Sequence, residues 1–304
     1  MLLGIEIGGT KLQLVLGGAD GRIVRRERRA IEKARGGEGI RAQIREVLPE
    51  LKSAERIEAI GVGFGGPVDW RTGKICCSHQ IEGWSDFNLA AWLYELIKVP
   101  IRVDNDANTA CLGEAIHGAG AGRNPVAYVT LGSGVGGGLV VNGKIYHGAT
   151  PGEMEVGHLR LDRHGTTIES RCSGWAVDRR IREAIRNEPS GPLFELCRGM
   201  DGGEARHLAE ALGQRDAKAG TILRESAEDL AFGLCHVVHL CHPEVIVLGG
   251  GLSLLGRPLQ ESVALALDRY IMDAFRPGPA ISLAALGEDS VPCGALLLAK
   301  SACA

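Results

Sequence analysis

The feature that most constrains this chain is a glycine-rich turn between two apolar segments near its start. Residues 4–24 read GIEIGGTKLQLVLGGADGRIV. The two apolar runs leave no room for a helix between them, so the segment predicts a β-hairpin. Its turn presents backbone N–H groups, together with the side chains of Thr10 and Lys11, and this combination suits an anion such as phosphate. Glu6 places a carboxylate just before the turn.

A second segment of the same kind occurs in the other half of the chain, where residues 126–145 read VAYVTLGSGVGGGLVVNGKI. The glycines suggest a dinucleotide-binding fingerprint, but that motif requires a helix after the last glycines, and here a second strand follows. Neither turn matches the GxxxxGK[ST] pattern, which excludes an ordinary P-loop. The repeat of strand, glycine turn and strand at 3–16 and 126–141 predicts two similar α/β domains that face each other across a nucleotide.

The length and the order of the elements predict an α/β fold with two domains. A chain of 304 residues with 45% hydrophobic residues can bury a large core, and about 150 residues form a typical domain. Strand-like runs alternate with helical patterns, of which the last internal one covers 258–274. The Gly-rich link HGAGAGRNP at 117–125 predicts a boundary between an N-terminal domain, 1–117, completed by a C-terminal helix at 289–304, and a C-terminal domain, 118–288.

Charge and apolar patterning argue against several classes of protein. The formal net charge is -3 and no long block of like charge occurs, so no nucleic-acid partner is expected, and the short run at 25–29 is interpreted as a solvated strand end. No apolar stretch approaches about 18 residues and no signal peptide precedes the first strand, so we expect a cytoplasmic protein that does not enter a membrane. The nine cysteines lack CxxC spacing and are expected to be reduced.

Three consecutive polar residues, Asp104, Asn105 and Asp106, lie where a strand ends and a helix begins in VDNDANTACLGEA. An isolated Asp or Asn at such a position is explained by capping of the helix. Three polar groups at the carboxyl end of an α/β strand favour a ligand site instead. Asp106, at or near the cap, is the candidate general base.

A second polar cluster follows in GEMEVGHLRLD at 152–162, which contains Glu153, Glu155 and His158. Glu169 comes shortly afterwards, before a predicted helix. A lone histidine is usually a surface or structural residue, but a histidine with carboxylates and flanking glycines favours a site. Groups of this kind fit the hydroxyls of a sugar.

The chain resembles the ROK sugar kinases, a branch of the actin-like ATPase superfamily. The resemblance covers nearly the whole chain and rests on motifs that occur in the order and spacing of that family: GIEIGGTK, GFGGPVD, IEGW, NDANTACLGE, TLGSGVGGG with NGKIYHGA, GEMEVGH, IESRCSGWAV and IVLGGGLS. It implies two RNase-H-like domains around a cleft for nucleotide and sugar. It also implies transfer of the γ-phosphoryl group of ATP to a sugar hydroxyl, in the presence of Mg²⁺.

The resemblance further implies a role for each matching residue. Asp106 would be the general base, and Glu6 would lie beside the Mg²⁺, directly or through water. The sugar would be held by Asn105, Glu155, His158 and Glu169, and by the backbone of Gly66. The nucleotide would be bound by two phosphate turns and an adenosine loop, namely Gly8, Gly9, Thr10 and Lys11, then Thr130, Gly132, Ser133 and Gly134, and finally Gly249, Gly250 and Gly251.

The sequence also departs from the family. Most members have Asp where this chain has Glu6, which puts the metal geometry in doubt, and Gln80 stands where Asn is frequent. The family's cysteine-rich zinc loop after His158 is missing, and Cys172 alone with His158 and His164 does not make a tetrahedral site, so no structural zinc is expected. The DNA-binding domain of the family's repressor branch is not expected either, since the chain starts at the phosphate turn.

The resemblance leaves the substrate open. We expect a hexose kinase of the glucokinase or fructokinase type, with an N-acylhexosamine kinase as the alternative in the same reaction class. A sensor that binds sugar or nucleotide without turnover is the alternative from another class, and the presence of Asp106 argues against it. The expected assembly is a homodimer, and the choice between ATP and polyphosphate as the donor stays open.

Overall fold

The computed structural model describes residues 1–78, 81–152 and 154–303, so the predictions made for Gln80 and Glu153 lie outside the described residues. The chain forms two compact units. The first contains residues 1–122, 138–154 and 285–304, and the second contains residues 123–137 and 155–284. The sequence predicts boundaries after residues 117 and 288, whereas residues 138–154 also group with the N-terminal part of the chain.

The first unit is built on a five-stranded sheet with the strand order β3-β2-β1-β4-β7. β1 and β2 form the antiparallel hairpin that the sequence predicts, and β4 and β7 continue the sheet in parallel with β1. The carboxyl ends of β1, β4 and β7 therefore meet at the same end of the sheet. The elements of this unit are β1 (Leu2–Ile7), β2 (Lys11–Gly17), β3 (Ile23–Ala30), η1 (Lys33–Arg35), α1 (Gly36–Ala54), β4 (Ala59–Phe64), β5 (Val68–Asp69), β6 (Lys74–Ile75), α2 (Leu89–Ile97), β7 (Ile101–Asn105), α3 (Asp106–His117), η6 (Gly287–Asp289) and α10 (Ser290–Ala302).

The second sheet has the order β10-β9-β8-β11-β12, which repeats the arrangement of the first. β8 (Val126–Leu131) and β9 (Val135–Val141) flank the second glycine turn, β10 (Lys144–Ile145) is antiparallel to β9, and β11 (Val245–Gly249) and β12 (Ala280–Leu283) continue in parallel. This common topology agrees with the repeat read from the sequence. Of these strands, β10 and residues 138–141 of β9 belong to the first unit. The second unit contains β8, β11 and β12 together with η2 (Val156–His158), α4 (Ile168–Cys172), α5 (Gly174–Asn187), α6 (Pro192–Cys197), η3 (Glu204–His207), α7 (Leu208–Gly213), α8 (Ala217–Cys241), η4 (Gly251–Leu255), α9 (Arg257–Leu267) and η5 (Asp273–Phe275).

The two faces of the first sheet are covered by different helices. Leu3, Ile5 and Ile7 of β1 belong to the large core that the sheet shares with α1 and α2. Leu2 belongs to a smaller cluster that contains Leu296 of α10. Because neighbouring residues of a strand point to opposite faces, Glu6 lies on the same face of β1 as Leu2.

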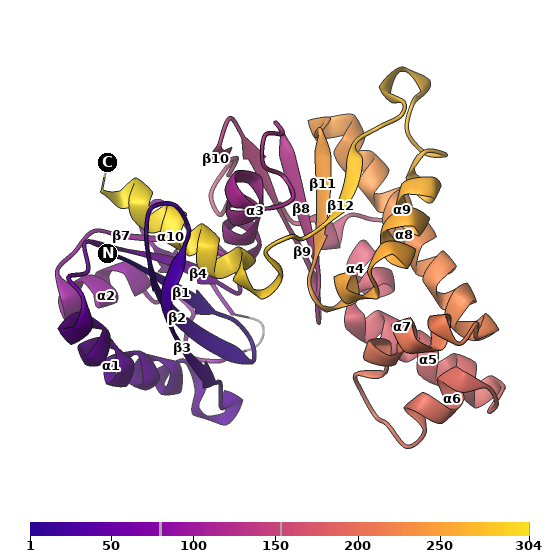
Figure 1. Ribbon diagram of the computed structural model, residues 1–304, viewed down its shortest axis with the longest axis horizontal. Helices are drawn as coiled ribbons and strands as arrows, with labels where there is room; N and C mark the ends of the chain where they lie inside the picture. Colours follow the sequence, from indigo (N-terminus) through magenta and orange to yellow (C-terminus); the bar gives the residue numbers. More distant parts are fainter. Residues whose placement is uncertain (79–80, 153, 304) are drawn as a thin grey trace. The chain divides into compact units, whose positions relative to one another are not determined.

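Helix α10 joins the first unit from the far end of the sequence (Figure 1). It packs against α3 and β4, and glycines allow a very close approach. A Cβ atom on Gly61 of β4 would lie 1.9 Å from the carbonyl oxygen of Ala295, and one on Gly294 of α10 would lie 1.8 Å from that of Thr109. Any side chain at these two positions would push α10 away from the sheet.

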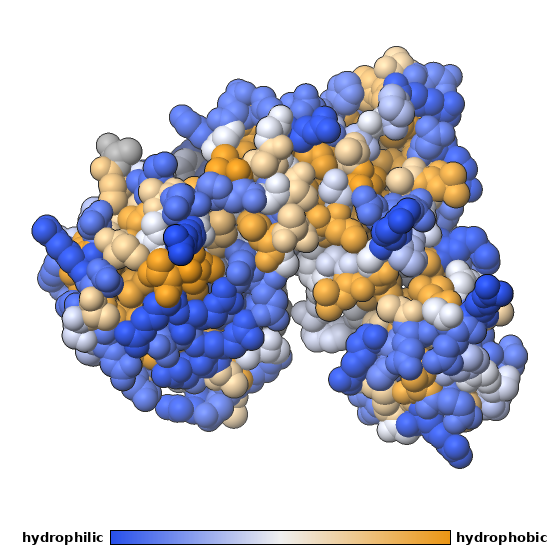
Figure 2. All heavy atoms as spheres, in the orientation of Figure 1, coloured by the Kyte–Doolittle hydropathy of each residue, from blue (hydrophilic) through white to orange (hydrophobic). Residues whose placement is uncertain are grey.

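Most predicted elements are present, with differences at the ends and in short helices. The helix predicted over 258–274 ends at Leu267 and is followed by η5. The charged run at 25–29 lies within β3, at the edge of its sheet, and not at a strand end. In Figure 2 the lower part of the first unit, where Figure 1 places β3 and α1, is covered mainly by hydrophilic residues. Among the described residues no helix is both long enough and apolar enough to cross a membrane.

Candidate active site

The first glycine turn is tied at both ends by backbone hydrogen bonds. Gly8 N–H donates to the carbonyl oxygen of Lys11 at 3.1 Å, and Ile31 N–H donates to that of Thr10 at 3.0 Å. Gly8 and Gly9 are half-buried and Thr10 is exposed. The turn is therefore held in place while the Thr10 side chain faces solvent, as a phosphate-binding turn requires.

Glu6 is the charged residue next to this turn, and two side chains hold its carboxylate. Lys11 Nζ lies 3.4 Å from Oε1, and Gln13 Nε2 donates to Oε2 at 2.7 Å. Burial raises the pKa of Glu6, while Lys11 and Gln13 act in the opposite direction. Gln13 Oε1 in turn accepts hydrogen bonds from Arg26 and Arg28 of β3. These contacts fix the carboxylate in one orientation beside the turn.

The surroundings of Glu6 fit the protein's share of a magnesium site. Mg²⁺ keeps several waters and is usually bound by one or two carboxylates together with substrate phosphates. Within the described ranges, no three His, Cys, Asp or Glu side chains are grouped so that they could hold a metal ion by themselves. One oriented carboxylate beside a phosphate turn meets the smaller requirement of a cation that is held mostly by phosphates and water.

Asp106 lies at the end of the first sheet where β1, β4 and β7 terminate. Gly65 N–H donates to the carbonyl oxygen of Ile7 at 2.8 Å, which joins the ends of β4 and β1. A Cβ atom on Gly65 would lie 3.3 Å from Asp106 Oδ2 and 3.7 Å from the Cα atom of Gly8. The tertiary structure therefore brings the Asp106 carboxylate next to the first glycine turn, although about a hundred residues separate them in the sequence.

Asn105, and not Asp106, is the N-cap of α3. Its Oδ1 accepts hydrogen bonds from the N–H groups of Ala107 and Asn108, at 2.8 and 3.2 Å. Asp106 is the first residue of the helix, where the helix dipole favours a negative charge. The capping explanation thus applies to Asn105, the residue before Asp106.

Gly66 is held by the same asparagine. Asn105 Nδ2 donates to the carbonyl oxygen of Gly66 at 3.2 Å. Gly66 has a φ of +155°, and a Cβ atom there would lie 2.9 Å from the carbonyl oxygen of Cys77. Only glycine fits this position, and its backbone lies beside the cap of the helix that carries Asp106.

The second glycine turn is tighter than the first and is also tied from outside. Gly132 N–H donates to the carbonyl oxygen of Gly134 at 3.0 Å, and Gly174 N–H, at the start of α5, donates to that of Gly132 at 2.7 Å. Ser133, between the two glycines, is exposed. The turn is thus anchored to α5 while its central residue faces solvent.

The structure places Glu169 at this second turn. Val135 N–H donates to Glu169 Oε2 at 2.9 Å, and a Cβ atom on Gly134 would lie 2.5 Å from the same oxygen. The sequence groups Glu169 with the sugar-binding residues, but its observed contact is with the backbone of the turn predicted to bind phosphate. Its role toward a sugar stays a prediction.

Gly249, Gly250 and Gly251 follow β11 and adjoin the same turn. Gly249 is paired with Thr130 in the parallel ladder of β11 and β8. Gly250 has a φ of +79°, and a Cβ atom there would lie 2.6 Å from the carbonyl carbon of Leu131. The glycines predicted for adenosine and those predicted for phosphate therefore converge at one end of the second sheet.

Glu155 and His158 lie close together, Glu155 as the N-cap of η2 and His158 as its last residue. His158 Nε2 is 3.9 Å from Glu155 Oε2, and their side chains are 74% and 52% exposed, respectively. Gly157 between them is buried, and a Cβ atom there would lie 2.1 Å from the carbonyl oxygen of Val135. The segment is pressed against the start of β9 while both polar side chains face outward, accessible to a ligand.

The segment in the place of the family's zinc loop forms a turn closed by hydrogen bonds. Leu161 N–H donates to the carbonyl oxygen of Thr166 at 2.9 Å. Asp162 Oδ1 accepts from the N–H groups of His164 and Thr166, at 2.6 and 3.1 Å. Cys172 is buried in α4, and its burial raises the pKa of the thiol to about 12. The expected absence of zinc stays a prediction.

Sequence reasoning missed two residues that organise this region, Gln13 and His147. Gln13 holds Glu6, and its position opposite Glu6 in a predicted hairpin was the signal that could have identified it. His147 pairs with Asp104 across 43 positions of sequence, and no local pattern indicates this contact.

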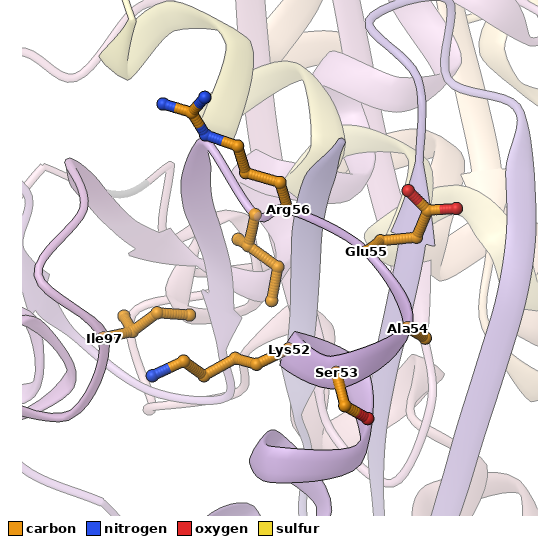
Figure 3. Close-up of a pocket in the computed structure, with 7 residues that line it drawn as sticks. Lys52, Ser53, Ala54, Glu55, Arg56 and Ile97 are labelled. Carbon is orange, nitrogen blue, oxygen red and sulfur yellow. The ribbon is translucent and has the colours of Figure 1, made fainter.

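A separate surface pocket lies at the C-terminal end of α1 (Figure 3). It is lined by Lys52, Ser53, Ala54, Glu55, Arg56, Ile57 and Ile97. None of these residues belongs to the candidate site. The pocket therefore adds nothing to the chemistry described above.

Comparison with known proteins gives one family along the whole chain. The model of the ROK family matches residues 2–302. A glucokinase of Thermotoga maritima is 29% identical over 311 residues, which cover 98% of this chain and 97% of the relative. A glucokinase of Halalkalibacterium halodurans is 31% identical and covers 98% of this chain and 94% of the relative.

Comparison with solved structures gives the same family. The crystal structure of a ROK family glucokinase from Streptomyces griseus in complex with glucose and AMPPNP superposes with a TM-score of 0.85. The two sequences are 28% identical, and the match covers 99% of each chain. The agreement extends over both units.

Proposed function

The chain belongs to the ROK family, and from this membership we propose that it is an ATP-dependent kinase that phosphorylates a hydroxyl group of a hexose. The observation that carries the proposal is the carboxylate of Asp106 at the carboxyl end of β7, beside Gly65 and next to the first glycine turn. Relatives named glucokinase match nearly the whole chain, which supports the same reaction.

Phosphoryl transfer requires positioning and neutralisation of charge more than covalent catalysis by the protein. In the proposed mechanism the sugar hydroxyl oxygen forms a bond to the γ-phosphorus, the bond from that phosphorus to the β,γ-bridging oxygen breaks, and Asp106 accepts the hydroxyl proton. The N–H groups of the two glycine turns donate to the phosphates. Lys11 supplies a positive charge at the first turn, where it now neutralises Glu6.

The remaining residues orient the reactants. We assign the sugar to Asn105, Glu155, His158 and Glu169 and to the backbone of Gly66, and adenosine to Gly249, Gly250 and Gly251. Mg²⁺, when bound beside Glu6, supplies further neutralisation of the phosphate charge. Gln13 Nε2 donates to the Glu6 carboxylate and holds it in one orientation.

An assay of ADP release with a panel of hexoses and N-acylhexosamines tests this function. We expect turnover with glucose or another hexose and ATP, and little turnover with the N-acylhexosamines. Turnover with an N-acylhexosamine alone would show that the substrate is a hexosamine derivative and not a hexose. Activity with polyphosphate but not with ATP would show that polyphosphate is the donor. Binding of sugar and nucleotide with no turnover on any sugar would favour the sensor. Sedimentation tests the expected homodimer, and cell fractionation tests the expected cytoplasmic location.

A further inference from the structure

Asp104 precedes the proposed base by two residues, and its carboxylate is used entirely within the first unit. The residue is 3% exposed. Oδ1 accepts hydrogen bonds from Asn105 N–H at 2.8 Å and from Asn108 Nδ2 at 3.0 Å, and Oδ2 lies 2.6 Å from His147 Nε2. A carboxylate with these three partners is oriented by the protein and orients the start of α3 in return.

His147 is held on its ring face as well as at its edge. The ring stacks on the indole of Trp70 with a centroid distance of 4.2 Å and an angle of 12° between the planes. Its side chain is only 15% exposed. Trp70 follows directly after β5, so the imidazole connects two different parts of the first unit, the β5 hairpin and the end of β7.

A second contact fixes the residues that follow His147. Asn108 Nδ2, besides its bond to Asp104, donates to the carbonyl oxygen of Gly152 at 2.9 Å. A Cβ atom on Gly152 would lie 2.6 Å from the Cβ atom of His147, so the loop folds back on itself. Residues 147–152 are therefore attached at both ends to the β7–α3 junction that carries Asp106.

We propose that His147 and Asp104 are positioning residues for sugar phosphorylation, an inference that rests on the proposed function. Asp104 Oδ1 accepts from Asn105 N–H, and Asn105 Nδ2 donates to the carbonyl oxygen of Gly66, so the pair fixes two of the groups to which we assign the sugar. Asp104 sets the position of the base. One buried contact between His147 and Asp104 thus positions both the base and these two sugar-binding groups.

The kinetic signature follows from this placement. Without the imidazole, Asp104 loses one of its three partners and holds Asn105, and through it Gly66, less firmly, so sugar binding weakens. The phosphate turn at Gly8–Lys11 has its own hydrogen bonds and does not depend on His147. We expect His147→Ala to raise the KM for sugar about tenfold, within the range for loss of residues that orient a site, while the KM for ATP changes less than about twofold.

The experiment compares His147→Ala with His147→Gln and with His117→Ala as the matched control. Glutamine can donate to Asp104 and should restore most of the sugar KM. His117 is exposed at the C-terminal end of α3, and its removal should change neither KM. If His147→Ala does not fold, Trp70→Ala replaces it. This variant removes the stack, keeps the contact of His147 with Asp104 and should also raise the sugar KM.

The inference is overturned if His147→Ala, or Trp70→Ala in its place, keeps the wild-type KM for sugar. It is also overturned if the KM values for sugar and ATP rise together by the same factor and glutamine does not restore them, because a general loss of structure would produce that result. The wild-type protein is assayed first on the sugar panel. Inactivity of the wild type on every sugar would contradict the proposed function, whereas active wild type with unaltered variants would contradict only the role of His147.

Discussion

Lys11 Nζ lies 3.4 Å from Glu6 Oε1, so the lysine predicted to meet ATP phosphates neutralises a buried carboxylate in this structure. The two residues flank the first glycine turn, and Gln13 holds the other carboxylate oxygen. A charged group at 9% exposure costs free energy unless it is paired. Lys11 and Gln13 offset only part of this cost, because burial still raises the pKa of Glu6. We infer that Glu6 is kept there for binding rather than for stability.

Glu6→Gln should lower turnover. It should also make the folded state more stable relative to wild type as the pH rises. Burial raises the pKa of Glu6 above its ordinary value of 4.5, so its ionisation removes stability from the folded state between pH 4.5 and the raised pKa. Glutamine cannot ionise, so the midpoint of thermal unfolding of the variant relative to wild type should increase as the pH rises from 4 to 8. We expect turnover to fall about 10–100-fold, as for loss of a group that orients a metal.

The control for this variant is Glu38→Gln on α1, a carboxylate fully exposed in its contacts with Arg41 and Arg45. It should leave turnover unchanged. A difference between Glu6→Gln and wild type that is independent of pH would show that Glu6 does not have a raised pKa.

Asp106→Asn should leave sugar binding largely in place and reduce kcat roughly 100-fold or more, as expected for removal of a positioned base. Asparagine has nearly the same shape as aspartate, so the midpoint of thermal unfolding should change little. Steady-state kinetics with sugar binding measured by calorimetry provide the test. Turnover within about threefold of wild type would rule out Asp106 as the base.

Glu169→Gln should separate two roles of one side chain. The glutamine carbonyl can accept the hydrogen bond from Val135 N–H, so the second glycine turn should keep its shape and the KM for ATP should stay within about twofold. If the carboxylate also binds sugar, the sugar KM should rise about tenfold, since hydrogen bonds to charged groups contribute about 1.5–3 kcal/mol. An increase in the KM for ATP alone would limit Glu169 to supporting the turn.

The purified protein should contain much less than one zinc per chain. A chelator should leave the midpoint of thermal unfolding unchanged. Cys172, the cysteine nearest in sequence to the position of the family's zinc loop, is buried and has a pKa raised to about 12, and a thiol of this kind is a poor source of the thiolate that zinc requires. Elemental analysis measures the content directly. One zinc per chain would show that His158, His164, Cys172 or a carboxylate forms a site in this region.

Asp162→Ala should destabilise the turn that stands in the zinc loop's place. Hydrogen bonds from the side chain and N–H of Thr166 and from His164 N–H lower the pKa of Asp162 below its ordinary value of 3.8. A lowered pKa means that the carboxylate stabilises the folded state above pH 3.8 and that this contribution is lost as the pH falls. The variant should therefore unfold at a lower temperature than wild type at pH 7 and approach wild type near pH 3. If the variant and wild type unfold at the same temperature at pH 7, Asp162 does not stabilise the turn.

The sequence alone determined the parts of this protein that depend on neighbouring residues. The alternation around Gly8–Lys11 predicted the β1–β2 hairpin, and its repetition at 126–141 predicted two related sheets. The polar residues at the end of β7 indicated the start of α3, and the ligand site that they suggest stays a prediction. These features are local because hairpins, caps and glycine turns are set by residues within a few positions of one another.

Tertiary structure decided which of these local features meet. Asp106 reaches the first glycine turn because β1, β4 and β7 run parallel, and Glu169 reaches the second because α4 packs beside it. The contact of Asp104 Oδ2 with His147 Nε2 joins residues 43 positions apart. No local pattern encodes such contacts, because they depend on packing between elements and on the burial of both partners, and these arise only when the sheets and helices have assembled.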